Sequence, residues 1–114
     1  MTGRPVLGPA VDALLAAAWN AGGTDILLTV GLPPTMRISG DLRPVPGLAA
    51  LTSHDVERLL GELVDLRADD AGRHEQDFSV SWRDLARVRG NAFSQRGQTA
   101  VALRIIPRRI FASR

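Results

Sequence analysis

Apolar residues recur at helical spacing near the start of the chain. They follow the i, i+3, i+4, i+7 pattern of one buried helix face and comprise Val11, Leu14, Leu15, Ala18 and Trp19. Proline is tolerated in the first helical turn, and glycine commonly ends a helix. The stretch that starts at Gly8-Pro9 and stops at Gly22-Gly23 therefore predicts one amphipathic helix.

A second helix has the clearest start signal in the chain. Thr52 can act as its N-cap, and Asp55 takes the place that Glu usually holds in a capping box. Leu51 and Val56 occupy the two positions of a hydrophobic staple. The expected apolar face comprises Val56, Leu59, Leu60, Leu63 and Val64. The polar stretch 66–75 that follows predicts a helical tail or a loop.

Strand patterns fill the rest of the chain. A short apolar run covers 26–30, alternation covers 35–39, and Gly40-Asp41 suits a hairpin turn into a return strand over 42–45. Alternation resumes at Phe78, Val80 and Trp82. Two strands over 87–94 and 98–106 follow, joined around Arg96-Gly97, and Pro107 ends the last. This order predicts an α+β fold, a mostly antiparallel sheet of about five or six strands packed against two main helices.

Composition narrows the class of protein. The chain has 114 residues, enough for one domain, with 45% hydrophobic and 23% charged residues. It lacks cysteine, a signal-type segment and an apolar run long enough to cross a bilayer. Two histidines without metal-site spacing make a protein-built metal site unexpected. We expect a soluble cytoplasmic domain that does not insert into a membrane and has no metal or cofactor of its own.

The charge pattern does not favour nucleic acid as a partner. All 14 basic residues are arginine, and the net charge is only +2. The sequence pI of 10.9 reflects the absence of groups that titrate just above neutral pH, not a strong positive field. Few aromatic residues are available for base stacking.

No self-contained active site is visible. There is no phosphate-binding GxxxxGK[ST] loop, no lysine to build one and no serine nucleophile elbow. Glu75, Asp77 and Asp84 lie near one another in the sequence, but carboxylates beside strand ends are usually solvated. We therefore expect no catalytic residue and no enzyme activity in this chain by itself.

The last hairpin carries the most informative pattern. A two-residue turn at Arg96-Gly97 places Arg89 opposite Arg104, and strand periodicity puts Arg87 on the same face. Opposed like charges destabilise a sheet, and the small residues Ala100 and Ala102 would leave that face open. An anion bound between the two guanidinium groups would turn this repulsion into a net attraction. Phosphate suits such a site, because two arginines match its oxygens well.

The pair of arginines could also be neutralised or separated within the fold itself. Aspartates or glutamates from distant parts of the chain could pair with both side chains. A slip of one residue in the strand register would move the two arginines apart. Both alternatives stay open at the level of sequence.

Several motifs, in order along the chain, resemble the opening of PilT-type twitching-motility ATPases, the retraction motors of type IV pili within the type II/IV secretion ATPase family. They are GTDILLTVGLPP at 23–34, RISGDL at 37–42, LT at 51–52, DFS at 77–79, RVRGNAFSQRG at 87–97 and LRIIP at 103–107. Two positions depart from the family pattern: Leu28 stands where histidine is frequent, and Val88-Arg89-Gly90 replaces a more usual Phe-Arg-Val.

This resemblance implies a domain organisation. Residues 1–7 would form a flexible tail, 8–106 a PAS-like N-terminal domain, and 107–114 the start of a linker to a RecA-like ATPase domain. Arg89 and Arg104 match family arginines that approach the nucleotide phosphates, and Arg37 is a weaker candidate. Asn91, Gln95 and Arg96 belong to the same motif as supporting residues, and Gln95 and Arg96 are as readily explained as turn residues.

The resemblance also implies partners for a longer parent protein. That protein would be a homohexameric ATPase that uses ATP and Mg²⁺, at the inner face of the cytoplasmic membrane. The domain would pack against RecA-like domains of its own and the neighbouring subunit, with a pilus platform protein as a further partner. The alternative is an autonomous PAS-like module that binds a small molecule or a protein and has no ATP-linked role.

Overall fold

The computed structural model describes residues 8–64 and 75–108. Helix α1 (Pro9–Ala21) precedes strands β1 (Gly23–Leu28), β2 (Thr35–Ile38) and β3 (Asp41–Pro44). Helix α2 (Ser53–Leu63) precedes strands β4 (Glu75–Trp82), β5 (Ala86–Gln95) and β6 (Gln98–Pro107). The predicted order of elements is confirmed. The expected tail 1–7, the stretch 66–74 and most of the expected linker 107–114 lie outside the described residues.

Helix α1 begins and ends as its sequence predicts. Pro9 occupies the first helical position, and Gly22 ends the helix in the left-handed conformation with φ 80°. The N-cap residue Gly8 has no side chain to accept a hydrogen bond from the first turn. Glu62 of α2 supplies one instead, because its Oε1 accepts from the backbone N–H of Val11 at 2.8 Å. Capping of α1 thus depends on α2.

Helix α2 has the predicted capping box. The Thr52 hydroxyl accepts from the backbone N–H of Asp55 at 3.0 Å, and the Asp55 carboxylate accepts from the backbone N–H of Thr52 at 2.9 Å. These two hydrogen bonds, the backbone one first, hold the pKa of Asp55 below its ordinary value. Leu51 and Val56 are both buried, as the hydrophobic staple requires.

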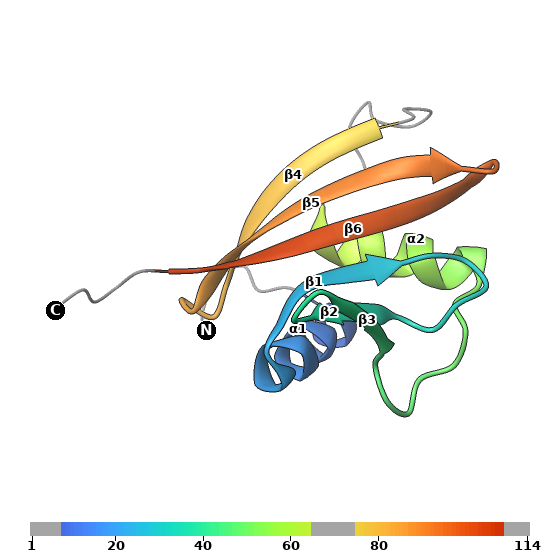
Figure 1. The fold of residues 1–114 in the computed structure, drawn as a ribbon. Coiled ribbons are helices and arrows are strands. Elements are labelled where there is room, and N and C mark those ends of the chain that lie inside the picture. Colours follow the sequence, from blue (N-terminus) through green and yellow to red (C-terminus); the bar gives the residue numbers. More distant parts are fainter. Residues whose placement is uncertain (1–7, 65–74, 109–114) are drawn as a thin grey trace, which may run out of the picture.

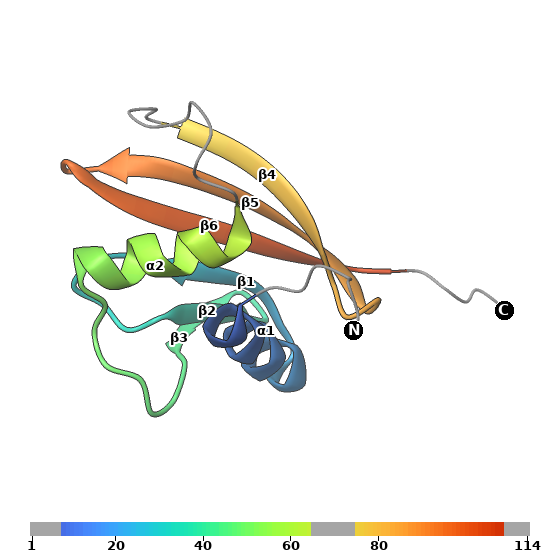
Figure 2. The same ribbon diagram turned by 180° about the vertical axis from the view of Figure 1, so that it is seen from behind.

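The strands of the described residues form one antiparallel sheet in the order β3-β2-β1-β6-β5-β4 (Figure 1). Strands β1 and β6 are neighbours at its centre although they lie far apart in the sequence, so their pairing joins the two halves of the chain. Both helices lie on one side of the sheet, as Figure 2 shows. We call the opposite side, which carries neither of these helices, the outer face. The expected α+β fold with two helices is confirmed.

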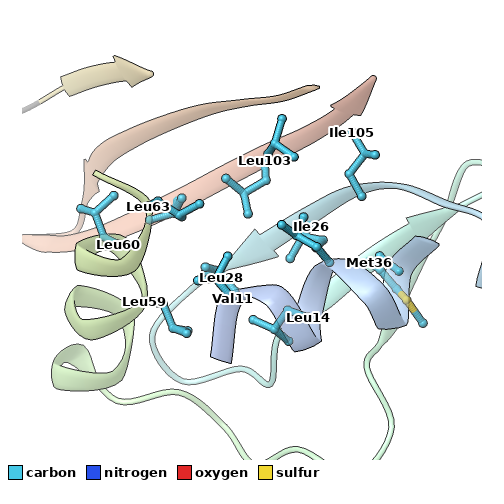
Figure 3. Close-up of a cluster of buried hydrophobic side chains, with 14 of the residues drawn as sticks. Val11, Leu14, Ile26, Leu28, Met36, Leu59, Leu60, Leu63, Leu103 and Ile105 are labelled. Atoms are coloured by element: carbon cyan, nitrogen blue, oxygen red, sulfur yellow. The ribbon is translucent and has the colours of Figure 1, made fainter. Parts of the chain in front are cut away.

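The core lies between the helices and the sheet. The apolar faces of α1 and α2 meet the inner side of β1, β2 and β6, and Figure 3 draws part of this cluster. Its labelled members are Val11, Leu14, Ile26, Leu28, Met36, Leu59, Leu60, Leu63, Leu103 and Ile105. Burial of this apolar surface is the main stabilising contribution to the fold. No helix of the described ranges is both long and apolar enough to cross a membrane.

One predicted turn is wrong by one residue. The β2–β3 hairpin turns at Ser39-Gly40, not at Gly40-Asp41, and Asp41 pairs with Ile38 as the first residue of β3. Both turn residues have positive φ, 52° and 87°. A two-residue turn with positive φ at both positions matches the twist of the flanking strands, and glycine at its second position meets that requirement.

A polar cluster ties α1 to the turn between β4 and β5. The Asp12 carboxylate accepts from the Trp82 indole N–H at 2.8 Å and from Nε and Nη2 of Arg83 at 3.0 and 2.6 Å. The Arg83 guanidinium lies 4.9 Å from the centroid of the Trp82 ring, which in turn packs edge-on against Trp19. The long β4–β5–β6 part of the sheet is thus anchored to the first helix.

Candidate functional site

The β5–β6 hairpin has the register that the sequence predicts. Its turn is Arg96-Gly97, with φ 54° and 80°, and Gln95 pairs with Gln98. Counting back along the ladder, Arg89 lies directly opposite Arg104. Arg87, Arg89 and Asn91 point to the outer face, because the residues between them are buried on the helix side. The predicted pairing of the two arginines is confirmed.

The same row of cross-strand neighbours continues over most of the sheet. Arg104 pairs with Asp25 of β1, and Asp25 pairs with Arg37 of β2. On the other side, Arg89 pairs with Ser79 of β4. Three arginines and one aspartate therefore lie side by side on the outer face. We call Arg37, Asp25, Arg104 and Arg89 the arginine row.

Asp25 is the carboxylate that the sequence left unidentified. Its Oδ2 accepts from Nε of Arg104 at 3.3 Å, while its Oδ1 accepts from the Thr24 hydroxyl at 2.6 Å. The Arg104 side chain is 70% exposed and that of Asp25 only 19% exposed. The alternative in which acidic residues from distant parts of the chain pair with the opposed arginines is therefore correct for Arg104. The ion pair is solvent-screened and contributes little to stability by itself.

Arg89 and Arg37 have different surroundings. Arg89 makes no hydrogen bond or ion pair with any residue in 8–64 or 75–108. Nη1 of Arg37 donates to the backbone carbonyl of Gly40 at 3.3 Å, within its own hairpin. The neighbouring Arg87 donates from Nη1 to the Ser79 hydroxyl at 2.8 Å. Arg89 is therefore the arginine of the row with the most donors left for an external acceptor.

The expectation that Ala100 and Ala102 leave the outer face open is wrong for Ala100. Ala100 is only 2% exposed and Ala102 is half-buried. Ala100 pairs with Phe93 of β5, and both side chains stand on the same side of the sheet. A large ring beside a small residue covers that residue, so the outer face is less open near the turn of this hairpin than the sequence predicts.

The three supporting residues lie further along the hairpin. Nδ2 of Asn91 donates to the Asp77 carboxylate at 2.6 Å, a cross-strand bond that gives Asn91 a structural role. Gln95 and Arg96 are exposed at the turn. They line a small pocket of about 140 Å³ together with residues of the segment after β1 and the start of β6. None of the three contacts the arginine row through a hydrogen bond within the described residues.

Asp77 and Asp84 do not gather into a site. Asp77 accepts a hydrogen bond from Asn91, and Asp84 forms a 3.2 Å ion pair with Arg108 just beyond the end of β6. Glu75 begins β4. Among the residues that the structure describes, no three His, Asp or Glu side chains are grouped so that they could hold a metal ion.

Asp25 is the functional candidate that sequence reasoning missed. The hairpin register could be counted from a local turn, but the pairing of β1 with β6 joins segments far apart in the sequence. A signal was present all the same. Asp25 is an acidic residue directly before the apolar run of its strand, and such a residue usually has a polar partner on the exposed side.

Comparison with known proteins identifies the relatives of this chain. No model of a known protein family matches it. The type IV pilus ATPase PilU of Pseudomonas aeruginosa is 34% identical over 96 residues, which cover 83% of the chain and 25% of PilU. The pilus retraction ATPase PilT of the same organism is 33% identical over 102 residues, 88% of the chain and 29% of PilT. The chain thus spans only between a quarter and a third of these curated relatives.

Solved structures agree with this result. The crystal structure of the pilus retraction motor PilT with bound ADP matches with a TM-score of 0.76 and 30% identity, over 84% of the chain and 29% of PilT. The Legionella pneumophila ATPase DotB matches with a TM-score of 0.70 over 94% of the chain and 31% of DotB, and at 20% identity it supports the fold alone. The chain is therefore a homologue of the N-terminal region of the PilT-type type IV pilus ATPases.

Proposed function

We propose that this chain is the N-terminal domain of a hexameric motor ATPase of the type IV pilus retraction or secretion class. In this proposal its arginine row contacts the phosphates of ATP held by a RecA-like domain. The arrangement of Arg89 and Arg104 carries the proposal: two guanidinium groups share one rung of the outer face, which no helix of the described residues covers. Two of the relatives are ATPases by name, and the solved PilT structure that resembles this chain contains ADP.

The chemistry of the arginine row suits this role. Arginine supplies only hydrogen-bond donors, in a planar fork that matches phosphate oxygens, and it stays charged at any physiological pH. ATP bound on the RecA-like domain would attract Arg89 and Arg104 and close the two domains. Hydrolysis and phosphate loss would weaken that attraction and let the domains reopen. Arg37 would add charge at the end of the row.

Mg²⁺ and ATP belong to the other domain in this proposal. The arginine row fits phosphate oxygens but contains one carboxylate, already bonded to Arg104 and Thr24. The parent protein would hold ATP and Mg²⁺ on its RecA-like domain, and this chain would contact the phosphates from the opposite side.

The same proposal assigns partners and location. The outer face would pack against RecA-like domains of its own and the neighbouring subunit in a homohexamer. The parent protein would work in the cytoplasm at the inner membrane, where a pilus platform protein is its further partner. The similarity to the type IV pilus ATPases PilU and PilT supports these assignments.

The test uses the full-length protein that contains this chain. Arg89→Ala and Arg104→Ala should each lower ATP turnover, by up to the roughly 10³-fold or more that arginine fingers contribute, or by less if the pair shares the load. The KM for ATP should change far less, and Arg→Lys should rescue poorly. Arg43→Ala is the matched control, since Arg43 is an exposed arginine on β3 outside the row. Turnover that stays at the level of this control would refute the phosphate contact.

A groove on the helical side favours a second candidate function, a small-molecule or protein-binding module without an ATP-linked role. The groove has a volume of about 500 Å³ and lies between α1, α2 and the segment 45–51. Its lining is mostly apolar, with Asp55 and Arg58 at its edge. A metabolite that stays bound to the purified chain through gel filtration, and is lost on Ala13→Trp, would support this function. This second function would also require that the Arg89→Ala and Arg104→Ala variants of the full-length protein keep the ATP turnover of the wild type.

A further inference from the structure

We infer that Asp25 is a positioning residue for Arg104 and holds its guanidinium ready for a phosphate-bearing ligand. This inference rests on the proposed phosphate contact of the arginine row. It adds a role for an acidic residue in a site whose anionic ligand that residue would by itself repel. The observation behind it is the way in which Asp25 binds Arg104: through Nε, at 3.3 Å.

The choice of nitrogen matters for what Arg104 can still bind. An arginine has five N–H donors, one on Nε and four on the two terminal nitrogens. Asp25 takes the Nε–H, and the terminal nitrogens of Arg104 bond to no residue of the described ranges. They remain free for two oxygens of one phosphate. Asp25 thus fixes the guanidinium without blocking the edge that recognises a phosphate.

Asp25 is itself held in place. Its second oxygen accepts from the Thr24 hydroxyl at 2.6 Å, and its side chain is only 19% exposed. Its strand pairs with β6 on one side and with β2 on the other, so its backbone lies within the sheet. The anchor is therefore more rigid than the 70% exposed side chain that it orients.

Arg89 provides an internal comparison. It faces the same side of the sheet, on the same rung, and has no carboxylate partner in the described part of the chain. Ordering a free side chain on binding weakens affinity, whereas a side chain ordered beforehand avoids most of that loss. We therefore assign different roles to the two arginines: Arg104 is oriented before the phosphate arrives, and Arg89 becomes ordered only when it binds.

A double-mutant cycle on this chain tests the inference. The probe is inorganic tripolyphosphate, titrated by NMR at fixed ionic strength into wild type, Arg104→Ala, Asp25→Ala and the double variant. Removing Asp25 also removes a negative charge, which by itself favours anion binding. That general effect is present with and without Arg104, so it cancels in the cycle.

The sign of the coupling decides between the two roles that Asp25 could have. If Asp25 positions Arg104, Arg104→Ala should weaken tripolyphosphate binding more in the wild-type background than in Asp25→Ala, by about two- to tenfold. If Asp25 instead competes with the anion for Arg104, the loss should be larger in Asp25→Ala. Either that reversal or equal losses in both backgrounds would overturn the inference. The control cycle replaces Arg104→Ala by Arg89→Ala and should give equal losses.

A second readout follows the anchor itself. The Nε–H signal of Arg104 should be more ordered than that of Arg89 in the ¹⁵N relaxation of the free wild-type chain. It should become as mobile as that of Arg89 in Asp25→Ala, with Asp25→Asn between the two because an amide oxygen can still accept. An Arg104 signal as mobile as that of Arg89 in the wild type would overturn the inference, without reference to any ligand.

The phosphate contact and the positioning role fail in distinguishable ways. If neither Arg89→Ala nor Arg104→Ala weakens tripolyphosphate binding, or if the wild type does not bind it, the phosphate contact fails and the role of Asp25 fails with it. If both variants weaken binding and the Asp25 cycle is additive, only the positioning role is refuted. Asp25→Val, which suits a strand and has no acceptor for the Arg104 Nε–H, replaces Asp25→Ala in the cycle if the alanine variant does not give the dispersed amide spectrum of a folded domain.

Discussion

At the scale of single residues, the arginine row places two like charges opposite each other in unequal surroundings. Arg104 has Asp25 beside it, whereas Arg89 has no acidic partner among the described residues. Opposed like charges destabilise an antiparallel pair by up to about 1 kcal/mol, and an adjacent carboxylate offsets part of that. The repulsion between the two guanidinium groups is thus partly compensated at Arg104 and not at Arg89.

This asymmetry predicts different stability effects for two matched variants. Arg89→Gln should raise the free energy of unfolding of the isolated chain, by about 0.5 kcal/mol, because it relieves the opposed charge and breaks no bond. Arg104→Gln relieves the same charge but breaks the Asp25 ion pair, so its effect should be close to zero. Urea unfolding of both variants at low and high salt measures this. An Arg89→Gln variant less stable than Arg104→Gln would contradict the assignment.

Gly90 leaves room for an aromatic ring on the neighbouring strand. Gly90 pairs with Phe78 of β4, and a Cβ at Gly90 would lie 2.3 Å from the Phe78 ring and 3.0 Å from a methyl group of Leu103. The ring therefore occupies the space that a side chain at position 90 would fill.

Gly90→Ala should accordingly destabilise the chain by about 1–3 kcal/mol, as overpacking of a core usually does. Thermal melting measures the loss. Combining Gly90→Ala with Phe78→Leu should recover part of the melting temperature, since the smaller side chain vacates the ring position. Additive losses in the double variant would show that the ring is not the obstacle.

At the scale of elements, α1 depends on α2 for its N-terminal cap. Glu62 accepts a hydrogen bond from the Val11 N–H, in place of the side chain that Gly8 lacks. Glu62→Ala should lower the free energy of unfolding by about 0.5–2 kcal/mol, the usual loss for a cap. Glu62→Gln, which keeps an oxygen acceptor, should lose less. Equal losses in the two variants, measured by chemical denaturation, would exclude the capping role.

The contact between α1 and the β4–β5 turn should depend on pH. Hydrogen bonds from Arg83 and then from Trp82 hold the pKa of Asp12 below its ordinary value. The group ionises more easily in the folded than in the unfolded chain. Its contribution to stability is therefore present above the unfolded pKa of about 4 and is lost as the pH falls through the lower folded value.

Asp12→Asn isolates this contribution. The variant should melt at a lower temperature than wild type at pH 7, and the difference should shrink as the pH falls below about 4. Asp55, whose pKa is also lowered, loses its contribution over the same range in both proteins and so cancels in the comparison. Asp41→Asn, which replaces an exposed aspartate of β3 with the same change of charge, is the matched control. A constant difference between pH 7 and pH 3 would argue against the ionic contact.

At the scale of the whole molecule, the sequence predicted what local rules determine. The capping box at Thr52, the stop at Gly22 and the β5–β6 register each follow from a few adjacent residues, and all three are confirmed. The β2–β3 turn was misplaced by one residue, because Ser39 adopts a positive φ that serine seldom takes. Local rules alone were sufficient only where a glycine or a cap residue allowed a single backbone conformation.

Long-range pairing was beyond such rules. The contact of Asp25 with Arg104 depends on β1 lying beside β6, and nothing in either segment specifies its neighbour. The same holds for Glu62 at the start of α1 and for Asp12 beside Trp82. The candidate site was therefore half predictable: its arginines follow from one hairpin, and its carboxylate follows from the order of strands in the sheet.

The isolated chain should neither hydrolyse ATP nor assemble into a ring. Its sequence contains no lysine and no phosphate-binding loop, and the one carboxylate of the arginine row, Asp25, is already bonded to Arg104 and Thr24 instead of being available as a base for water. Two copies that met through their outer faces would bring like charges together, which opposes self-association. We therefore expect a monomer in sedimentation and no ATPase activity that follows the protein through a sizing column. Turnover that co-elutes with the chain after repurification would show that it is a catalyst in its own right, and a stable hexamer would show that ring contacts do not require a RecA-like domain.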